Sequence, residues 1–376
     1  MIYRKISDRI KTKLKSGKAI IILGARQTGK TTLLHQLFEK KSDIAWINGD
    51  DADTQAIFEN VSSTKLQTIF AGKKIIVIDE AQRISDIGIK LKLITDNMQD
   101  VQLIVTGSSA FELSNKINEP LTGRKWEYQL FPLSFGEMVK HHGLIEEKRL
   151  LQHRLIYGYY PDVVTHAGNE KEILKQLSDS YLYKDILMWE HIKNPEKLVR
   201  LLKALSFQIG NQVSFNELGR LTDMDMKTVE KYIRLLEQVF IIFCVGSLSR
   251  NLRSELKSSR KIYFYDNGIR NAIIADFNQA ELRQDIGALW ENFMMSERIK
   301  HLHYNGIWAN KYFWRTHAQQ EIDYIEEKDG QFSAYEFKWN PKVKAKFPKT
   351  FFNTYPNSSK VFIHRDNYES FLGFES

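Results

Sequence analysis

A glycine-rich stretch near the N-terminus, "GARQTGKTT", carries side chains whose types and spacing suit the binding of phosphate. Four residues separate Gly24 from Gly29, and Lys30 and Thr31 follow directly. The glycines let the backbone curl until consecutive N–H groups converge on phosphate oxygens, at the start of a helix whose dipole favours anions. Lys30 would then reach the β- and γ-phosphates of ATP, and the Thr31 hydroxyl would ligate Mg²⁺. The predicted ATP-binding residues of this loop are Gly24, Ala25, Arg26, Gln27, Thr28, Gly29, Lys30, Thr31 and Thr32.

A pair of carboxylates at the end of the apolar run in "KKIIVIDEAQ" agrees with this prediction. Asp79 ends the run, where it can hold the Mg²⁺ through water. Glu80 comes next, outside the run, where it can orient and deprotonate the attacking water. Two carboxylates at this place could instead cap a helix. Beside the phosphate loop they indicate ATP hydrolysis, with Lys30 and Glu80 as catalytic residues.

Three further polar side chains are candidates for the same site. Thr106 and Ser108, in "LIVTGSSAFEL", follow the next strand-like run, where they can hydrogen-bond the γ-phosphate or the attacking water. Capping of the following helix by Ser108 or Ser109 is the alternative. Arg124, in "LTGRKWEY", is a candidate transition-state arginine that acts in its own subunit or on a neighbour. A solvated surface arginine is the alternative there.

A second group of chemically active residues lies in "EIDYIEEKDGQFSAYEFKW", near the C-terminus. Asp323 and Glu336 could hold a second Mg²⁺, and Lys338 could position the water that attacks phosphorus, as metal-dependent phosphodiester cleavage requires. On an alternating strand, Glu336 and Lys338 point to the same face. Glu291, in "LWENF" on the preceding helix, is a candidate fourth member. Two other interpretations stay open: a cross-strand ion pair on an exposed face, and a DNA clamp without catalysis.

The stretch "SFNELGRLTDMDMKTVEKYIRLLEQ" predicts a helix-turn-helix. In its second helix, 227–237, Val229, Ile233 and Leu236 face inward and basic residues face outward. The loop that follows, "SLSRNLRSELKSSRK", is basic up to Arg260 and Lys261. A basic helix beside a basic loop suits contact with a phosphate backbone, although such modules also serve as lids or protein contacts. The predicted DNA contacts are Lys227, Lys231, Arg234, Arg250, Arg253 and Lys257.

The elements that position these residues follow from the hydrophobic pattern. From residue 19 to about 131, short β-type runs alternate with helical patterns, which predicts a parallel sheet with helices on both faces. Helical patterns follow, then the helix-turn-helix with two strand-like runs, and finally a long helix before several aromatic-rich strands. The predicted domains are an ATPase core at 1–140, a helical lid or connector at 141–205, a winged helix-turn-helix at 206–280, and an α/β domain at 281–376.

Composition narrows the class of protein. The chain has 376 residues, which suit two or three domains. A net charge of +8 weakly favours a polyanionic partner. Cys244 is the only cysteine, which excludes a disulfide framework and fits a reducing cytosol. The charged start is not a signal peptide, and no apolar run approaches the ~20 residues of a membrane span. We therefore expect a cytoplasmic protein that does not contact a membrane.

The motifs together resemble a large family of bacterial and archaeal ATPases of the AAA+ type. The stretches that carry the resemblance are "GARQTGKTT", "IIVIDEAQ", "IVTGSSAFEL", "LTGR", "LFPLSFGEM", "GYYPDVV", "YLYKDI", "KIYFYDNGI", "GALWENF", "EIDYI" and "YEFKW". The resemblance implies a P-loop NTPase core, an all-α lid with a winged helix, and a C-terminal α/β domain of restriction-endonuclease-like (PD-(D/E)xK) fold. Ala25 stands where the family has proline, and Lys184 stands where an arginine is common before Asp185.

These observations predict an ATPase that hydrolyses Mg-ATP and acts on DNA by remodelling, translocation or processing of branched forms. Its cofactors are ATP and Mg²⁺, and its partners are DNA and further copies of the chain, for which a hexameric ring is one candidate. The C-terminal domain would bind the DNA, with or without cleavage. The alternative is a nucleotide-dependent switch that binds protein partners and carries an inactive nuclease fold.

Overall fold

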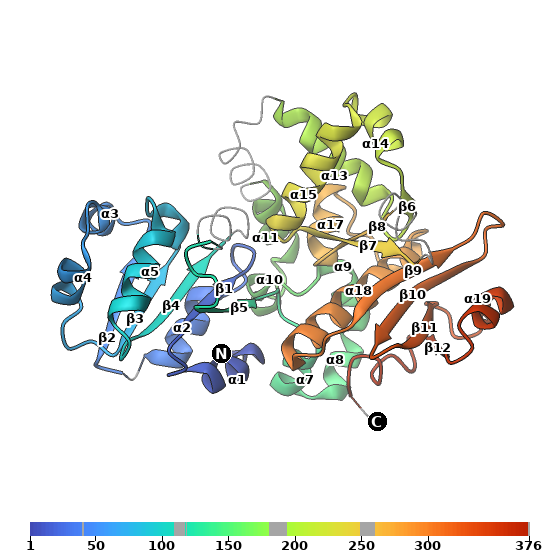
Figure 1. Cartoon of the computed structure of the whole chain (residues 1–376). Coiled ribbons are helices and arrows are strands. Elements are labelled where there is room, and N and C mark those ends of the chain that lie inside the picture. Colours follow the sequence, from blue (N-terminus) through green and yellow to red (C-terminus); the bar gives the residue numbers. More distant parts are fainter. Residues whose placement is uncertain (40, 109–116, 118, 180–193, 249–259, 375–376) are drawn as a thin grey trace. The chain divides into compact units, whose positions relative to one another are not determined.

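The computed structural model describes residues 1–39, 41–108, 117, 119–179, 194–248 and 260–374 (Figure 1). By its internal contacts the chain divides into two compact units. The first unit holds residues 1, 3–132 and 238–240, and the second holds residues 2, 133–237 and 241–376.

The first unit is built on a five-stranded sheet in the order β2-β3-β4-β1-β5, in which all neighbouring strands are parallel. The strands are β1 (Ala19–Leu23), β2 (Ile44–Asn48), β3 (Ile75–Asp79), β4 (Gln102–Gly107) and β5 (Lys125–Gln129). All residues of β1 and β4 are buried. Runs of this kind belong to a parallel sheet that is covered on both faces. The predicted parallel sheet is therefore confirmed.

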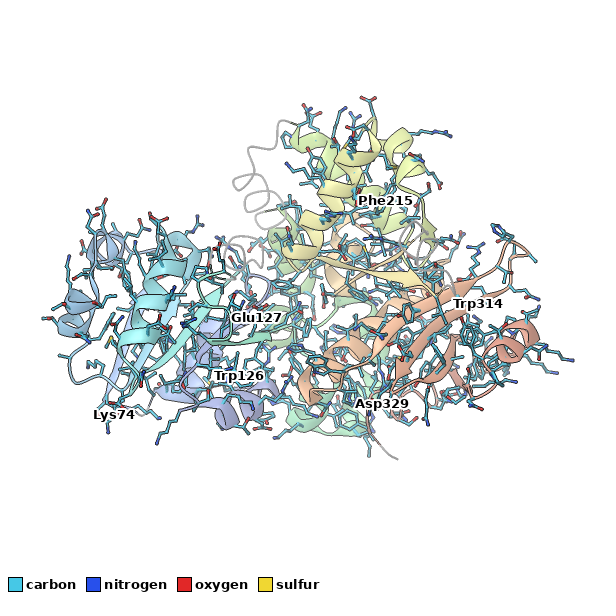
Figure 2. The ribbon with its side chains drawn as sticks, in the orientation of Figure 1. Lys74, Trp126, Glu127, Phe215, Trp314 and Asp329 are labelled. Atoms are coloured by element: carbon cyan, nitrogen blue, oxygen red, sulfur yellow. The ribbon has the colours of Figure 1, made fainter. Side chains whose placement is uncertain are left out.

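Helices supply the cover. They are α1 (Ile6–Lys13), α2 (Lys30–Phe38), α3 (Ala52–Phe58), α4 (Ser63–Ile69), α5 (Ile87–Asn97) and the short 3₁₀ helix η1 (Ala81–Arg83). One apolar cluster joins α3, α4 and α5 to Ile21, Ile78 and Val105 of the sheet. Ile20 and Ile22 alternate with Ile21 and are also buried, so the other face is covered too. Trp126 of β5, labelled in Figure 2, lies 4.4 Å from the ammonium of Lys13 on α1.

The second unit is built on a seven-stranded sheet in the order β12-β11-β10-β9-β7-β8-β6. Its strands are β6 (Gln212–Val213), β7 (Ile242–Ser247), β8 (Arg260–Phe264), β9 (Asn310–Arg315), β10 (Glu321–Lys328), β11 (Gln331–Phe337) and β12 (Ser359–Ile363). The pairs β7–β9 and β11–β12 are parallel, and the others are antiparallel. One sheet thus runs across the boundary that the sequence analysis placed at residues 280 and 281.

The helices of this unit pack on both sides of that boundary as well. They are α7 (Phe135–His142), α8 (Leu144–Arg149), α9 (Leu151–Tyr157), α10 (Pro161–Thr165), α11 (Glu170–Leu177), α13 (Pro195–Phe207), α14 (Phe215–Thr222), α15 (Met226–Gln238), α17 (Asn267–Ile273), η3 (Ala280–Leu282), α18 (Ile286–Asn305) and α19 (Lys349–Thr354). The main core gathers Trp290 and Phe293 of α18 with Tyr324 and Phe337 of the sheet. Phe135 belongs to the same core, although the sequence analysis assigned residues up to 140 to the ATPase core.

The segment from α13 to β8 has the element order expected of the helix-turn-helix. Helices α13, α14 and α15 precede β7 and β8, which pair antiparallel, and β6 joins the far edge of β8. Val229, Ile233 and Leu236 of α15 are fully buried, as the pattern predicts. Phe215, which begins α14, and Trp314 of β9 are labelled in Figure 2. Trp314 packs against Phe351 of α19. A winged-helix role for this segment stays a prediction.

Candidate functional site

The phosphate loop joins the end of β1 to the start of α2 at the carboxyl edge of the sheet. A Cβ on Gly24 would lie 2.2 Å from the Leu130 carbonyl oxygen, so no other residue fits there without a backbone shift. Gly29 has a φ of 90°, which strains any residue with a side chain. Each glycine of the motif is therefore required for its own reason: Gly24 for the close approach of the Leu130 backbone, and Gly29 for its left-handed conformation.

Lys30 lies inside this loop with only 5 % of its surface exposed. Its ammonium donates hydrogen bonds to the carbonyl oxygens of Gly24 (2.9 Å) and Ala25 (3.0 Å). Thr28, which is fully buried, donates its hydroxyl to Ala25 at 2.8 Å. The other loop residues are less enclosed: Arg26 is half-buried, and Gln27, Thr31 and Thr32 are exposed.

The two predicted magnesium ligands, Thr31 and Asp79, are in contact. The Thr31 hydroxyl donates to Asp79 Oδ2 at 2.6 Å, which joins α2 to the end of β3. The Thr106 hydroxyl, at the end of β4, donates to Asp79 Oδ1. A hydroxyl and a carboxylate from two elements are oxygen ligands of the kind that Mg²⁺ prefers. These residues fit the cation that a P-loop ATPase requires.

Glu80 lies beside this pair and is held by three neighbours. Its backbone N–H is 3.2 Å from Asp79 Oδ1 and from the Thr106 hydroxyl. Gln82 donates its amide to Glu80 Oε2 at 2.5 Å and to the Ser108 hydroxyl at 2.9 Å. Glu80 also has a φ of 48°, a left-handed conformation that concentrates at functional sites in residues other than glycine. The structure thus brings Thr106 to Asp79 and links Ser108 to Glu80 through Gln82.

Two residues of this site were missed in the sequence. Gln82 follows Glu80 by two positions, and its part in holding Glu80 depends on the 3₁₀ turn of η1. Arg4 is buried, and its guanidinium donates to the carbonyl oxygens of Thr28 (2.5 Å) and Phe131 (2.6 Å). It therefore ties the phosphate loop to the segment after β5. No local motif marks Arg4, because its partners are 24 and 127 residues away.

Arg124 does not lie with the other predicted residues. Its carbonyl oxygen accepts from the backbone N–H of Ala19, the first residue of β1. The phosphate loop follows the last residue of β1, about 13 Å farther on at about 3.3 Å a residue. The Arg124 side chain, half exposed, pairs with Asp96 at 2.6 Å. This placement does not support action on the phosphates of its own subunit, and action on a neighbour stays a prediction.

A second polar cluster lies in the other unit and brings together the four residues predicted near the C-terminus. Asp323 is near the start of β10, Glu336 is near the end of β11, and Lys338 follows β11 directly. The Lys338 ammonium is 3.2 Å from Asp323 Oδ2 and 3.1 Å from Glu336 Oε2. Glu291, on α18, joins the cluster through its contacts with Lys261 and Tyr263.

Lys261, from β8, is the residue of this cluster that the sequence analysis placed wrongly. It was assigned to a basic loop, but it lies in a strand, and only 2 % of its surface is exposed. Its ammonium lies 3.0 Å from Glu291, 2.7 Å from Glu321 and 3.9 Å from Asp323. Tyr263, two residues on, donates its hydroxyl to Glu291 at 2.7 Å. Burial alone would lower the pKa of Lys261, but the charges of Glu291, Asp323 and Glu321 outweigh it and raise that pKa.

Burial and neighbouring charges also shift the pKa values of Glu291 and Glu336. Burial raises the pKa of Glu291, the charge of Lys261 lowers it, and that of Asp323 raises it again, with a net rise. Burial and then the charge of Asp323 raise the pKa of Glu336 to about 8. Glu336 Oε1 is buried and has no hydrogen-bond partner among the described residues.

These residues do not fit a resident divalent cation in this arrangement. The carboxylates of Glu291, Glu321 and Asp323 face the Lys261 ammonium. The Lys338 ammonium bridges Asp323 and Glu336. Within the described ranges, no three His, Cys, Asp or Glu side chains are placed to hold a metal ion. The contacts of Asp323 and Glu336 therefore do not support the predicted metal site, which stays a prediction.

The predicted DNA contacts are described in part. Lys227, Lys231 and Arg234 are exposed on α15, and Arg234 pairs with Glu230 at 2.6 Å. Asp225 caps the helix through the backbone N–H groups of Lys227 and Thr228, each at 3.0 Å. The remaining three, Arg250, Arg253 and Lys257, lie outside the described residues.

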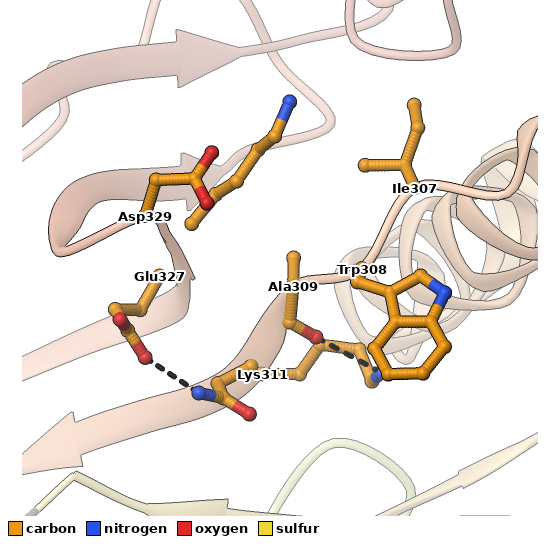
Figure 3. Close-up of a pocket in the computed structure, with 8 residues that line it drawn as sticks. Ile307, Trp308, Ala309, Lys311, Glu327 and Asp329 are labelled. Carbon is orange, nitrogen blue, oxygen red and sulfur yellow. Dashed lines mark hydrogen bonds between the residues drawn. The ribbon is translucent and has the colours of Figure 1, made fainter.

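A pocket of about 410 Å³ lies at the far end of the β10–β11 hairpin from Asp323 and Glu336. Figure 3 shows the indole of Trp308 and the bond from Asn310 to Glu327, 2.6 Å long. Trp308 is 89 % exposed, and Lys311 donates to the Ala309 carbonyl at 3.5 Å. Two acidic and two basic side chains line this pocket, so its lining does not select one ligand charge.

Comparison with known proteins matches three segments of the chain to protein families. Residues 16–139 match a family described as an AAA domain. Residues 148–281 and 286–371 match two families described as domains of unknown function, DUF8612 and DUF4143. The acidic cluster takes Lys261 and Tyr263 from the first of these two segments and its carboxylates from the second.

Relatives extend over most of the chain. An uncharacterized protein of Methanocaldococcus jannaschii is 24% identical over 343 residues, which cover 85% of this chain and 74% of the relative. An uncharacterized protein of Mycobacterium tuberculosis is 24% identical over 340 residues, covering 89% and 73%. A solved Walker-type ATPase of Pyrococcus abyssi has a similar fold, with a TM-score of 0.51 and 14% identity over 72% of this chain and 95% of that one.

The first unit is thus an AAA-type P-loop ATPase domain by its sheet, its phosphate loop and its family match. The second unit adds a separate mixed α/β sheet. Among the described residues, no helix is both long and apolar enough to cross a membrane.

Proposed function

We propose that this protein hydrolyses Mg-ATP and uses the reaction to act on DNA. The observation that carries the first half is the convergence of Thr31, Asp79 and Glu80 at the mouth of a loop that holds a buried lysine. Lys30 and Thr31 begin the helix α2, and Asp79 and Glu80 stand at the end of the strand β3, so the arrangement depends on the fold and not on one local turn.

Each residue has a definite part in the reaction. Mg²⁺, when bound with ATP, would be held by Thr31 and Asp79 and would offset the negative charge of the phosphates. Lys30 points its ammonium at the loop interior, where consecutive backbone N–H groups also face the phosphates. Thr31 and Asp79 orient toward the cation position. Glu80, held by Gln82, accepts the proton of the attacking water.

The DNA half of the proposal is supported by charge. Lys227, Lys231 and Arg234 lie exposed on the outer side of the helix α15, whose other side is buried. The segment after β11 adds the exposed residues Lys342, Lys344 and Lys346. Exposed cations on a helix-turn-helix suit sequence-independent contact with phosphates.

Salt-dependent DNA binding tests this half. The double variant Lys227→Ala/Lys231→Ala should weaken binding and flatten the plot of log affinity against log salt by about 1.8, because each phosphate contact contributes about 0.9. The matched control is Lys65→Ala/Lys92→Ala, which removes two exposed lysines of the ATPase domain and should change neither quantity.

The outcome separates the proposal from the alternative of a protein-binding switch. Binding that is independent of salt, or equal losses in both double variants, would remove the basis for DNA contact by α15. A nucleotide-dependent switch with protein partners would then be the better account of the same ATP site.

A further inference from the structure

The acidic cluster of the second unit contains a cation of its own. Three carboxylates, from α18 and β10, lie around the ammonium of Lys261 at 2.7 to 3.9 Å. Glu291 and Glu321 each approach within hydrogen-bonding distance, and Tyr263 completes the contact with Glu291. The aromatic ring of Phe313 covers the ammonium at 5.7 Å. The lysine is therefore enclosed by groups that match a positive charge.

The position of this ammonium is where a metal-dependent phosphodiesterase needs a divalent cation. Such enzymes place the cation between carboxylates of neighbouring elements. Here Asp323 turns Oδ1 toward Lys261, while its Oδ2 accepts from Lys338 and from the backbone N–H of Phe337 at 2.9 Å. Both oxygens of the central aspartate are thus directed at protein donors or cations.

The lysine is held in place by the fold. It belongs to β8, where it pairs in register with Val245 of β7, and the sheet continues through β9 to β10. Gly210, in the turn before β6, leaves room beside the cluster: a Cβ there would stand 3.4 Å from the Glu291 carboxyl carbon. The turn before β6 and the strand β8 therefore both lie against the cluster.

We propose that Lys261 is the resident cation of this cluster and excludes a divalent metal ion from it. The C-terminal domain then contacts DNA without a metal, and Asp323 and Glu336 do not form a cleaving site while Lys261 is in place. This inference goes beyond the proposed function, because the ATP site and the basic face of α15 do not depend on it.

Binding of Mn²⁺ to the full-length, nucleotide-free chain tests the proposal. The chain carries Asp79→Asn throughout, so that the ATPase domain contributes no metal site. Free Mn²⁺ is measured by electron paramagnetic resonance. We expect no bound Mn²⁺ up to about 1 mM, the upper range of weak protein sites. With Lys261→Met added, we expect one bound Mn²⁺ per chain, with a dissociation constant at least about 10-fold below that 1 mM limit.

Three controls make the result specific. Lys311→Met removes an exposed lysine of β9 and should gain no Mn²⁺. Lys261→Arg keeps the positive charge and should gain none. Adding Asp323→Asn to Lys261→Met should abolish the gained site. Mn²⁺ should also raise the melting temperature of Lys261→Met and leave that of the Asp79→Asn chain unchanged.

Two outcomes overturn the proposal. One is an Mn²⁺ ion bound by the Asp79→Asn chain and lost on adding Asp323→Asn, a result that needs no Lys261 variant to fold. The other is a folded Lys261→Met or Lys261→Gln chain that binds no Mn²⁺, because Lys261 would then not be what excludes it. Neither outcome bears on ATP turnover or on the salt dependence of DNA binding, so the proposed function is judged separately.

Discussion

Lys30 and Lys261 are both almost completely buried, with 5 % and 2 % of their surfaces exposed, but their surroundings differ. Lys30 donates to the backbone carbonyls of Gly24 and Ala25, which carry no net charge. Lys261 faces the carboxylates of Glu291, Glu321 and Asp323. The first ammonium donates to carbonyl oxygens of the phosphate loop, whereas the second is neutralised by carboxylates.

This difference shows that the ATP site and the acidic cluster contain similar residue types but differ in their chemistry. Both sites contain carboxylates and a lysine, and both were predicted to handle phosphate with Mg²⁺. In the ATPase domain the carboxylates of Asp79 and Glu80 are bound by hydroxyl, amide and backbone donors. A cation can join such a site without displacing another cation. In the second unit a divalent ion would have to displace a buried lysine.

The largest effect is expected at Lys30. Lys30→Ala removes the ammonium of the phosphate loop, so ATP turnover should fall about 1,000-fold or more, since charge stabilisation dominates phosphoryl transfer. The measurement is steady-state release of phosphate. Turnover within a few-fold of the unaltered chain would contradict the assignment of Lys30 as the lysine that contacts the phosphates of ATP.

Lys261 should matter next, through stability. Lys261→Met leaves buried carboxylates without their cation, and we expect a loss of about 3 kcal/mol in the free energy of unfolding. Urea unfolding followed by tryptophan fluorescence measures it. Adding Glu291→Gln removes one of the stranded charges and should recover part of the loss. Equal stability of Lys261→Met and the unaltered chain would mean that the lysine is not neutralised by its neighbours.

Glu80 should separate binding from hydrolysis. Glu80→Gln keeps the shape of the side chain but removes the proton acceptor, so turnover should fall about 100-fold while ATP remains bound. Single-turnover kinetics and equilibrium binding of a fluorescent ATP analogue report the two quantities. Rapid hydrolysis in this variant would mean that another group accepts the proton.

Arg4 is a positioning residue, and its effect should be smaller. Arg4→Met loses the hydrogen bonds to Thr28 and Phe131, and we expect KM for ATP to rise about 10-fold, in line with about 1.5 kcal/mol for bonds to a charged donor. The value of kcat should change less, and Arg4→Lys should recover part of the loss. An equal fall in kcat with constant KM would point to a direct catalytic role instead.

Arg124 should show the smallest effect in a chain that acts alone. Because it lies at the opposite edge of the sheet from the phosphate loop, Arg124→Ala should change turnover by less than about 2-fold at high dilution. A loss that grows with protein concentration would support action on a neighbouring subunit. A full loss at all concentrations would contradict the placement described above.

The ATP site was predictable because its residues are local or end neighbouring strands. Gly24 to Thr31 form one contiguous motif, and Asp79, Glu80 and Thr106 follow β-type runs whose carboxyl ends meet at one edge of a parallel sheet. Such proximity follows from strand order alone. Gln82 and Arg4 were missed, because one acts through a 3₁₀ turn and the other through distant carbonyls.

The acidic cluster was predictable only in part. Asp323, Glu336 and Lys338 lie on a hairpin, where register brings them together, and Glu291 follows from its helix. Lys261 comes from 30 residues before Glu291, in a segment whose many basic residues suggested solvent. Its burial depends on the parallel pairing of β7 with β9, a long-range contact that no local pattern encodes.

The most direct test of the proposed function is the rate of ATP turnover with and without duplex and branched DNA, in the unaltered chain and in Lys30→Ala. We expect Mg²⁺-dependent turnover that DNA increases, that rising salt returns to the basal rate, and that Lys30→Ala abolishes. Turnover that saturating DNA leaves unchanged, or that survives in Lys30→Ala, would contradict the account.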